Sequence, residues 1–250
     1  MPFTFSHPAI VLPLTKARLN LSATGLIIGS MVPDFEYFIR MIDVTKYSHT
    51  LFGIFWFDLP IAVLVSFIFH QVVRNCLFDN LPSFLRDRFF VYKKLNWPRY
   101  FVKNWPFVLL SIIIGSVSHI LWDGVTHNTM FYVKQAELST MMKIGTINLA
   151  GYKFLQMAST IAGGLGVIYS IFSLRRIRRP KTKIDYRYWP MVLFIACFVF
   201  FFRFSKFGFH FYYFRYHRAV AVVFISSMMI GLILTPLLLN KKSGQNQMAF

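Results

Sequence analysis

Three ionisable residues spaced four apart, His119, Asp123 and His127, close an apolar run that begins near Trp105. In a helix, steps of four keep side chains on one face, about 6 Å apart along the axis. This spacing suits a metal ion or a proton relay. Because an ionised Asp at the centre of a membrane helix costs about 2.5–3.5 kcal/mol, ionisable residues at such a depth indicate a functional site.

Further His and acidic residues precede the first long apolar run: His7, Asp34, Glu36 and His49. Imidazole and carboxylate groups bind Zn, Mn, Fe or Mg, and a mixed set leaves positions open for water and substrate. We predict a divalent metal as cofactor, zinc first, with manganese, iron or magnesium as alternatives. The predicted ligands are His7, Asp34, His49, His119, Asp123 and His127.

Two carboxylates outside the predicted ligand set are candidates for proton transfer. Glu36 and Asp58 are predicted to act as general bases toward a water molecule. A network of hydrogen bonds between helices, or a proton relay, is the alternative interpretation of the same His and Asp residues.

The composition is that of a membrane protein. Of the 250 residues, 56% are hydrophobic and only 14% are charged. Apolar runs long enough to cross a membrane of about 30 Å occupy residues 51–73, 105–125, 152–174 and 219–239, with a shorter one at 189–202. The fold class predicted is all-α, a polytopic integral membrane helical bundle with about six membrane segments.

The first segment allows two arrangements. A weaker apolar stretch covers residues 21–39, and a single crossing there would separate His7 from the other candidate ligands. A short helical hairpin over residues 8–19 and 21–31 would instead return His7 to Asp34. In either case residues 1–130 form a membrane domain carrying the metal site, and residues 131–250 add C-terminal membrane helices to the same integral unit.

The strongly basic charge is explained by membrane topology. The net charge of +18 comes from 27 Lys and Arg against 9 Asp and Glu. The basic residues gather at 74–103, 175–183 and 241–242, beside apolar runs, which predicts cytoplasmic loops and a cytoplasmic C-terminus. Membrane lipids are the expected partners, a lipid-linked substrate among them, and no motif indicates nucleic acid. The oligomeric state is left open.

Four motifs carry a family resemblance: FSHPAI at residues 5–10, GSMVPDFEY at 29–37, YSHT at 47–50 and SHILWDGVTH at 118–127. Together they resemble a bacterial multi-pass membrane family of unknown function, over most of the chain. Over the first 130 residues or so, their order is also similar to that of YdjM-like membrane-bound metal-dependent hydrolases. The resemblance implies a bacterial cytoplasmic (inner) membrane protein and phosphoester hydrolysis. It singles out His7, Asp34, His49, His119 and Asp123, followed by His127 and Glu36.

The predicted function is therefore a membrane-bound metal-dependent hydrolase of a lipid-linked or membrane-delivered ester, a phosphoester first. A proton- or metal-ion-coupled transporter would use the same residues to relay or bind ions. A non-catalytic membrane scaffold would use them only to pair helices.

Overall fold

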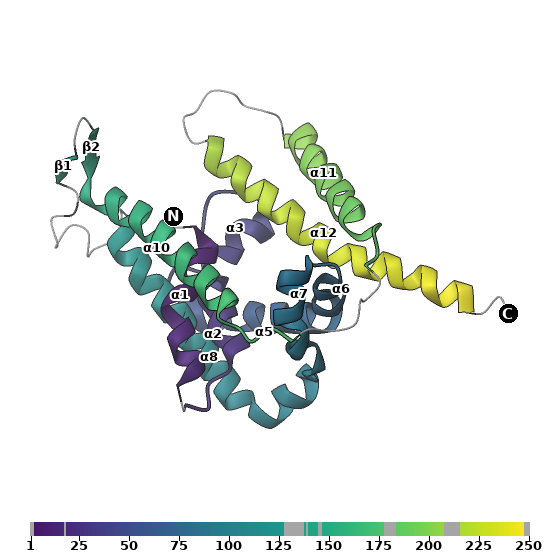
Figure 1. The fold of residues 1–250 in the computed structure, drawn as a ribbon. Coiled ribbons are helices and arrows are strands. Elements are labelled where there is room, and N and C mark those ends of the chain that lie inside the picture. The colour runs from purple at the N-terminus through teal and green to yellow at the C-terminus, as the bar shows by residue number, and fades with distance from the viewer. Residues whose placement is uncertain are drawn as a thin grey trace. The chain divides into compact units, whose positions relative to one another are not determined.

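The chain forms an all-α polytopic membrane protein, which confirms the predicted fold class. The computed structural model describes residues 3–17, 19–127, 138, 140–144, 147–177, 184–207 and 216–247. Within these ranges five helices are long and apolar enough to span a membrane (Figure 1): Leu51–Asp79, Trp97–Thr126, Gly151–Phe172, Tyr188–Ser205 and His217–Leu239. They match the four long apolar runs of the sequence and the shorter one at residues 189–202, whereas the weaker stretch at residues 21–39 does not form a spanning helix.

The first spanning helix contains two π-helical segments. It consists of α4 (Leu51–Gly53), a π-helical segment (Ile54–Asp58), α5 (Leu59–Ile68), a second π-helical segment (Phe69–Val73) and α6 (Arg74–Asp79). The Thr50 hydroxyl caps its start by accepting a hydrogen bond from the Gly53 N–H. Short π-helical segments are frequent at functional sites, and Asp58 ends the first of them.

The chain divides into two compact units. The first comprises Met1–Phe35, Lys46–Ser66 and Phe101–Ser173, and the second comprises Glu36–Thr45, Phe67–Tyr100 and Leu174–Phe250. The division into residues 1–130 and 131–250 stays a prediction.

An N-terminal hairpin of short helices belongs to the first unit. It runs through a 3₁₀ turn (Thr4–Ser6), α1 (Pro8–Val11), a second 3₁₀ segment (Leu12–Lys16), α2 (Ala23–Gly29) and a third 3₁₀ turn (Val32–Asp34). Proline stands at the start of three of these pieces, where its missing N–H does no harm. With seven residues, α2 is only about 10 Å long and cannot cross a membrane. Of the two predicted arrangements, the structure has the hairpin.

Helix α8 (Trp97–Thr126) packs tightly against α2 in the same unit. A Cβ atom on Gly29 would lie 2.4 Å from the carbonyl oxygen of Ile112, and one on Gly115 would lie 2.6 Å from that of Leu26. Only glycine permits this approach of the two backbones. Non-helical backbone at Asn104, two residues before Pro106, interrupts α8 nearer its start.

A β-hairpin leads into the last helix of the first unit. Strands β1 (Met141–Ile144) and β2 (Ile147–Ala150) pair antiparallel, and α10 (Gly151–Phe172) follows directly (Figure 1). The hairpin lies in a connection for which the sequence predicted no element. Its strands are the only described departure from the all-helical pattern.

The second unit holds α3 (Phe35–Arg40), apart from its first residue, together with α7 (Ser83–Phe89), α11 (Tyr188–Phe207) and α12 (Tyr216–Gln247). Helices α11 and α12 lie side by side (Figure 1). The buried Arg74 guanidinium donates hydrogen bonds to the carbonyl oxygens of Lys93 and Leu95, which fixes the turn before α8.

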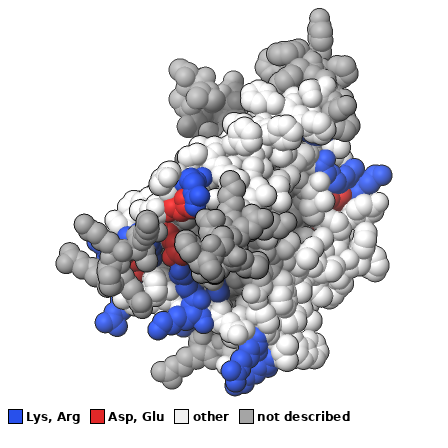
Figure 2. Space-filling view, turned by 90° about the vertical axis from the view of Figure 1, so that its right-hand side faces the viewer, with Lys and Arg blue, Asp and Glu red and all other residues white. Residues whose placement is uncertain are grey.

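On the face drawn in Figure 2, Lys and Arg gather in a few clusters within a largely uncharged surface.

Candidate metal centre

Four side chains of the first unit converge on one buried point: Asp34, His49, His119 and Asp123. One ligand atom of each lies within 4.8 Å of the others. His49 Nε2 is 3.6 Å from Asp34 Oδ1 and 3.6 Å from Asp123 Oδ2. His119 Nε2 is 3.6 Å and 3.5 Å from the same two oxygens. We call these four residues the His/Asp cluster.

These separations suit ligands that share an ion. They exceed the 2.7–3.2 Å of a protein hydrogen bond. Ligand atoms at about 2.1 Å from a tetrahedral metal stand about 3.4 Å from one another, close to the values in the cluster. Asp34 Oδ1 and His119 Nε2 are buried and accept or donate no hydrogen bond within the described part of the chain. Burying a polar atom without a hydrogen bond costs free energy unless an ion or another group binds to it. The cluster could therefore hold a metal ion.

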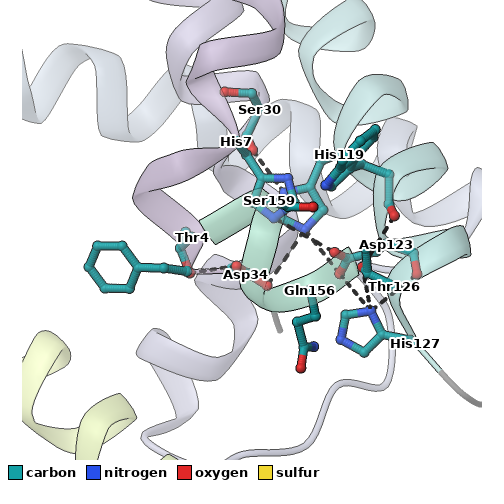
Figure 3. A network of polar contacts seen from close by, with 12 residues as sticks. Thr4, His7, Ser30, Asp34, His119, Asp123, Thr126, His127, Gln156 and Ser159 are labelled. Carbon is teal, nitrogen blue, oxygen red and sulfur yellow. Dashed lines mark hydrogen bonds and ion pairs between the residues drawn. The ribbon is translucent and has the colours of Figure 1, made fainter. Parts of the chain in front are cut away.

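A second set of contacts aims the ligand atoms (Figure 3). His119 Nδ1 lies 2.8 Å from the carbonyl oxygen of Ser30, to which it donates, so Nε2 is the ring nitrogen directed at the cluster. His49 Nδ1 is 3.0 Å from the Ser48 hydroxyl, which leaves its Nε2 directed at the cluster. The Thr4 hydroxyl donates a 2.5 Å hydrogen bond to Asp34 Oδ2, so that Oδ1 is the oxygen left for an ion.

The charges of the cluster balance one another. Burial alone would lower the pKa of His49, but the carboxylates of Asp123 and Asp34 raise it to about 9. Burial would likewise raise the pKa of Asp34, but His119 and His49 lower it below its usual range. Without a metal, protonated imidazole neutralises the carboxylates, and a bound ion would take the place of that protonation.

His7 lies beside the cluster (Figure 3). Its ring stacks on that of His119, with centroids 3.9 Å apart and planes at 20°. Its Nε2 is 3.6 Å from Asp123 Oδ1, the oxygen that does not face His49 and His119. Burial and the repulsion of His119 lower the pKa of His7 to about 4, so its imidazole is neutral at pH 7.

His127 is near Asp123 without joining the cluster. Its Nδ1 is 3.1 Å from the backbone carbonyl oxygen of Asp123 and 3.6 Å from Asp123 Oδ2. The Thr126 hydroxyl lies 3.4 Å from the same nitrogen. Burial lowers the pKa of His127.

The two predicted general bases are not members of the His/Asp cluster. Asp58 is buried in the first unit, in the π-helical segment that packs against Val32–Asp34. Glu36 belongs to the second unit, where its carboxylate pairs with Arg40 at 2.9 Å. The roles of both residues as bases stay predictions.

Sequence reasoning missed the residues that orient the cluster. Thr4 and Ser48 stand close to His7 and His49 in the sequence, which is the only signal that could have indicated them. Ser30 contributes a backbone carbonyl, for which residue type gives no signal.

Fold and site together define a polytopic helical membrane protein with a buried His/Asp cluster that could hold a metal ion. The chain belongs to the family described as "Domain of unknown function (DUF4184)", whose model matches residues 1–237. No curated protein and no solved structure matched the chain.

Proposed function

We propose that this protein is a membrane-bound metal-dependent hydrolase acting on a lipid-linked or membrane-delivered ester, a phosphoester in particular. The observation that carries the proposal is the convergence of four buried ligand atoms at metal-ligand spacing, with orphaned atoms among them. Zinc is the metal we propose, because it binds imidazole and carboxylate ligands and can expand from four to five ligands, which leaves a position for a water molecule beside the four residues.

Asp34, His49, His119 and Asp123 would hold the ion. A divalent metal held there would supply an activated water near neutral pH and would polarise the ester oxygen. His7 borders the cluster with a neutral imidazole, and we assign to its Nε2 the acceptance of the water's proton. Thr4 and Ser30 keep the ligands oriented throughout.

Further support comes from the sequence resemblance to YdjM-like hydrolases, which share the order of the His and Asp motifs. On the same basis we propose a bacterial inner-membrane location, with the basic loops and the C-terminus cytoplasmic. The cluster then lies toward the outer side, and membrane lipids are the partners within reach.

Elemental mass spectrometry on detergent-purified protein tests the proposal. Wild type should contain close to one equivalent of metal, and His119→Ala and Asp123→Ala should lose it while keeping their helical circular dichroism. His217→Ala is the control, because His217 is exposed and outside the cluster. Metal-loaded wild type should then hydrolyse phosphoesters that the two variants leave intact. Failure of wild type to bind any metal, even after metal is added back, would contradict the proposal and favour a proton relay or a helix-packing network.

A further inference from the structure

A groove of about 270 Å³ lies beside the His/Asp cluster in the first compact unit. Its wall combines residues from the N-terminal hairpin, from α8 and from α10: His7, Ala9, Ile10, Trp122, Ser159 and Ala162. His7 is common to the groove and to the surroundings of the cluster. The remaining wall is mainly apolar, with a Ser hydroxyl near His7.

Specific contacts between α10 and the N-terminal hairpin form one side of the groove. The Ser6 hydroxyl donates to the carbonyl oxygen of Thr160 at 3.0 Å, and the Phe3 N–H donates to the Thr160 hydroxyl at 3.2 Å. A Cβ atom on Gly163 would lie 2.7 Å from the Ser6 carbonyl oxygen, so only glycine allows this contact. The small side chains of Ala9 and Ala162 leave the space next to it open.

The outer edge of the groove adjoins a surface suited to hydrocarbon. Helix α10 is a candidate membrane span, and none of its apolar window is buried in the protein. Its exposed apolar residues follow helical spacing along one stripe: Phe154, Met157, Ile161, Leu165 and Ile168. Ala162 is exposed, lies next to this stripe and lines the groove. The groove therefore runs from the lipid-facing side of α10 to His7.

We propose that this groove binds one hydrocarbon chain of a membrane phospholipid, with the ester group of that lipid placed at His7 and the cluster. A volume of about 270 Å³ accommodates about nine groups of the size of water or methylene, at about 30 Å³ each. Binding of the chain rests on the groove alone, whereas cleavage of the lipid rests on the proposed function. The lipid class follows from the apolar residues of the wall together with the polar side chains of Ser6, His7 and Ser159, which can face the ester group.

Photo-crosslinking tests chain binding without relying on activity. Wild type in nanodiscs doped with a phospholipid that carries a diazirine in its acyl chain should be labelled on groove residues. Ala162→Trp fills the groove and should reduce this labelling about tenfold. Ile161→Trp is the matched control, because it adds the same ring one residue away on the lipid-facing stripe. Undiminished groove labelling in Ala162→Trp, or labelling confined to the stripe, would overturn the proposal.

Hydrolysis separates the two proposals. With metal content unchanged, Ala162→Trp should lose most activity toward the long-chain phospholipid and keep its activity toward a water-soluble phosphodiester. Equal loss of both activities in Ala162→Trp would overturn the groove as a chain site. Groove labelling in a wild type that hydrolyses neither ester would support the lipid site and overturn the proposed function.

Discussion

The contact most open to a clean test is the hydrogen bond from Thr4 to Asp34. It is buried, 2.5 Å long and joins residues thirty positions apart, and it leaves Asp34 Oδ1 directed at the cluster. Thr4→Val keeps the shape of the side chain and removes the donor. The carboxylate should then turn more freely, and metal binding should weaken while the fold persists.

The magnitude follows from the kind of bond. A hydrogen bond to a charged group contributes about 1.5–3 kcal/mol. Taking about 2 kcal/mol as the loss in the binding free energy, the dissociation constant for zinc rises about thirtyfold, since 1.4 kcal/mol corresponds to a factor of ten. This agrees with the 10–100-fold losses typical when a residue that orients a metal ligand is removed.

Competition with a chromophoric zinc chelator in detergent measures the dissociation constant. Thr4→Ser retains the hydroxyl and should stay close to wild type. Thr15→Val is a second control, because the Thr15 hydroxyl donates to the nearby Leu12 carbonyl oxygen and Thr15 is not part of the cluster. Equal zinc affinity in Thr4→Val and wild type would refute the orienting role of Thr4 and weaken the assignment of Asp34 as a ligand.

Three further predictions address packing, protonation and the second unit. Gly29→Ala places a Cβ atom 2.4 Å from a backbone oxygen of α8 and should lower the free energy of unfolding by about 1–3 kcal/mol. Gly164→Ala should leave the free energy of unfolding unchanged, because a Cβ atom there would lie 3.8 Å from its nearest neighbour. Thermal melts of the two variants test this difference. Because the pKa of His49 is raised to about 9, zinc should displace a proton at pH 7 and bind about tenfold more tightly per pH unit up to about pH 9. Calorimetry in buffers of different ionisation enthalpy counts that proton, and a count of zero would contradict the charge assignment. The stability that His49 gives the metal-free protein is present below about pH 6.5 and lost as the pH rises through about 9. Arg74→Met removes the donor to two partly buried carbonyl oxygens and should lower the free energy of unfolding by about 1–3 kcal/mol. Its zinc content should match wild type by elemental analysis, and a loss of metal would show that the second unit supports the site.

The membrane fold could be predicted from the sequence because long apolar runs impose helices wherever backbone groups must be satisfied inside a bilayer. The stretch at residues 21–39 could not be settled in this way, since its length and hydropathy fit one span or two short pieces. Local signals limit the helix to a short piece. Ser22 caps the start of α2, and Pro33 lies in a new turn only four residues after α2 ends. The contact between Gly29 and α8 then holds the short helix in place.

The sequence predicted which residue types form the candidate site, but it predicted only part of how they are arranged in space. Helical spacing puts His119 and Asp123 on one face, and the structure places His119 Nε2 3.5 Å from Asp123 Oδ2. Spacing carries no information about Asp34 and His49, which reach the same point through the N-terminal hairpin and the start of the first spanning helix. The tautomer of His119 depends on a carbonyl oxygen of Ser30, brought near by tertiary packing alone.

His127 shows where the spacing argument stops. It follows Asp123 by four residues, as Asp123 follows His119, but α8 ends at Thr126. His127 lies one residue past the helix end, and its Nδ1 is turned back to the Asp123 carbonyl oxygen at 3.1 Å. That oxygen also accepts the backbone N–H of His127, and a carbonyl oxygen can accept two hydrogen bonds. The imidazole therefore has a backbone partner at the helix end, and a four-residue step predicts a shared ligand face only while both residues lie within the helix.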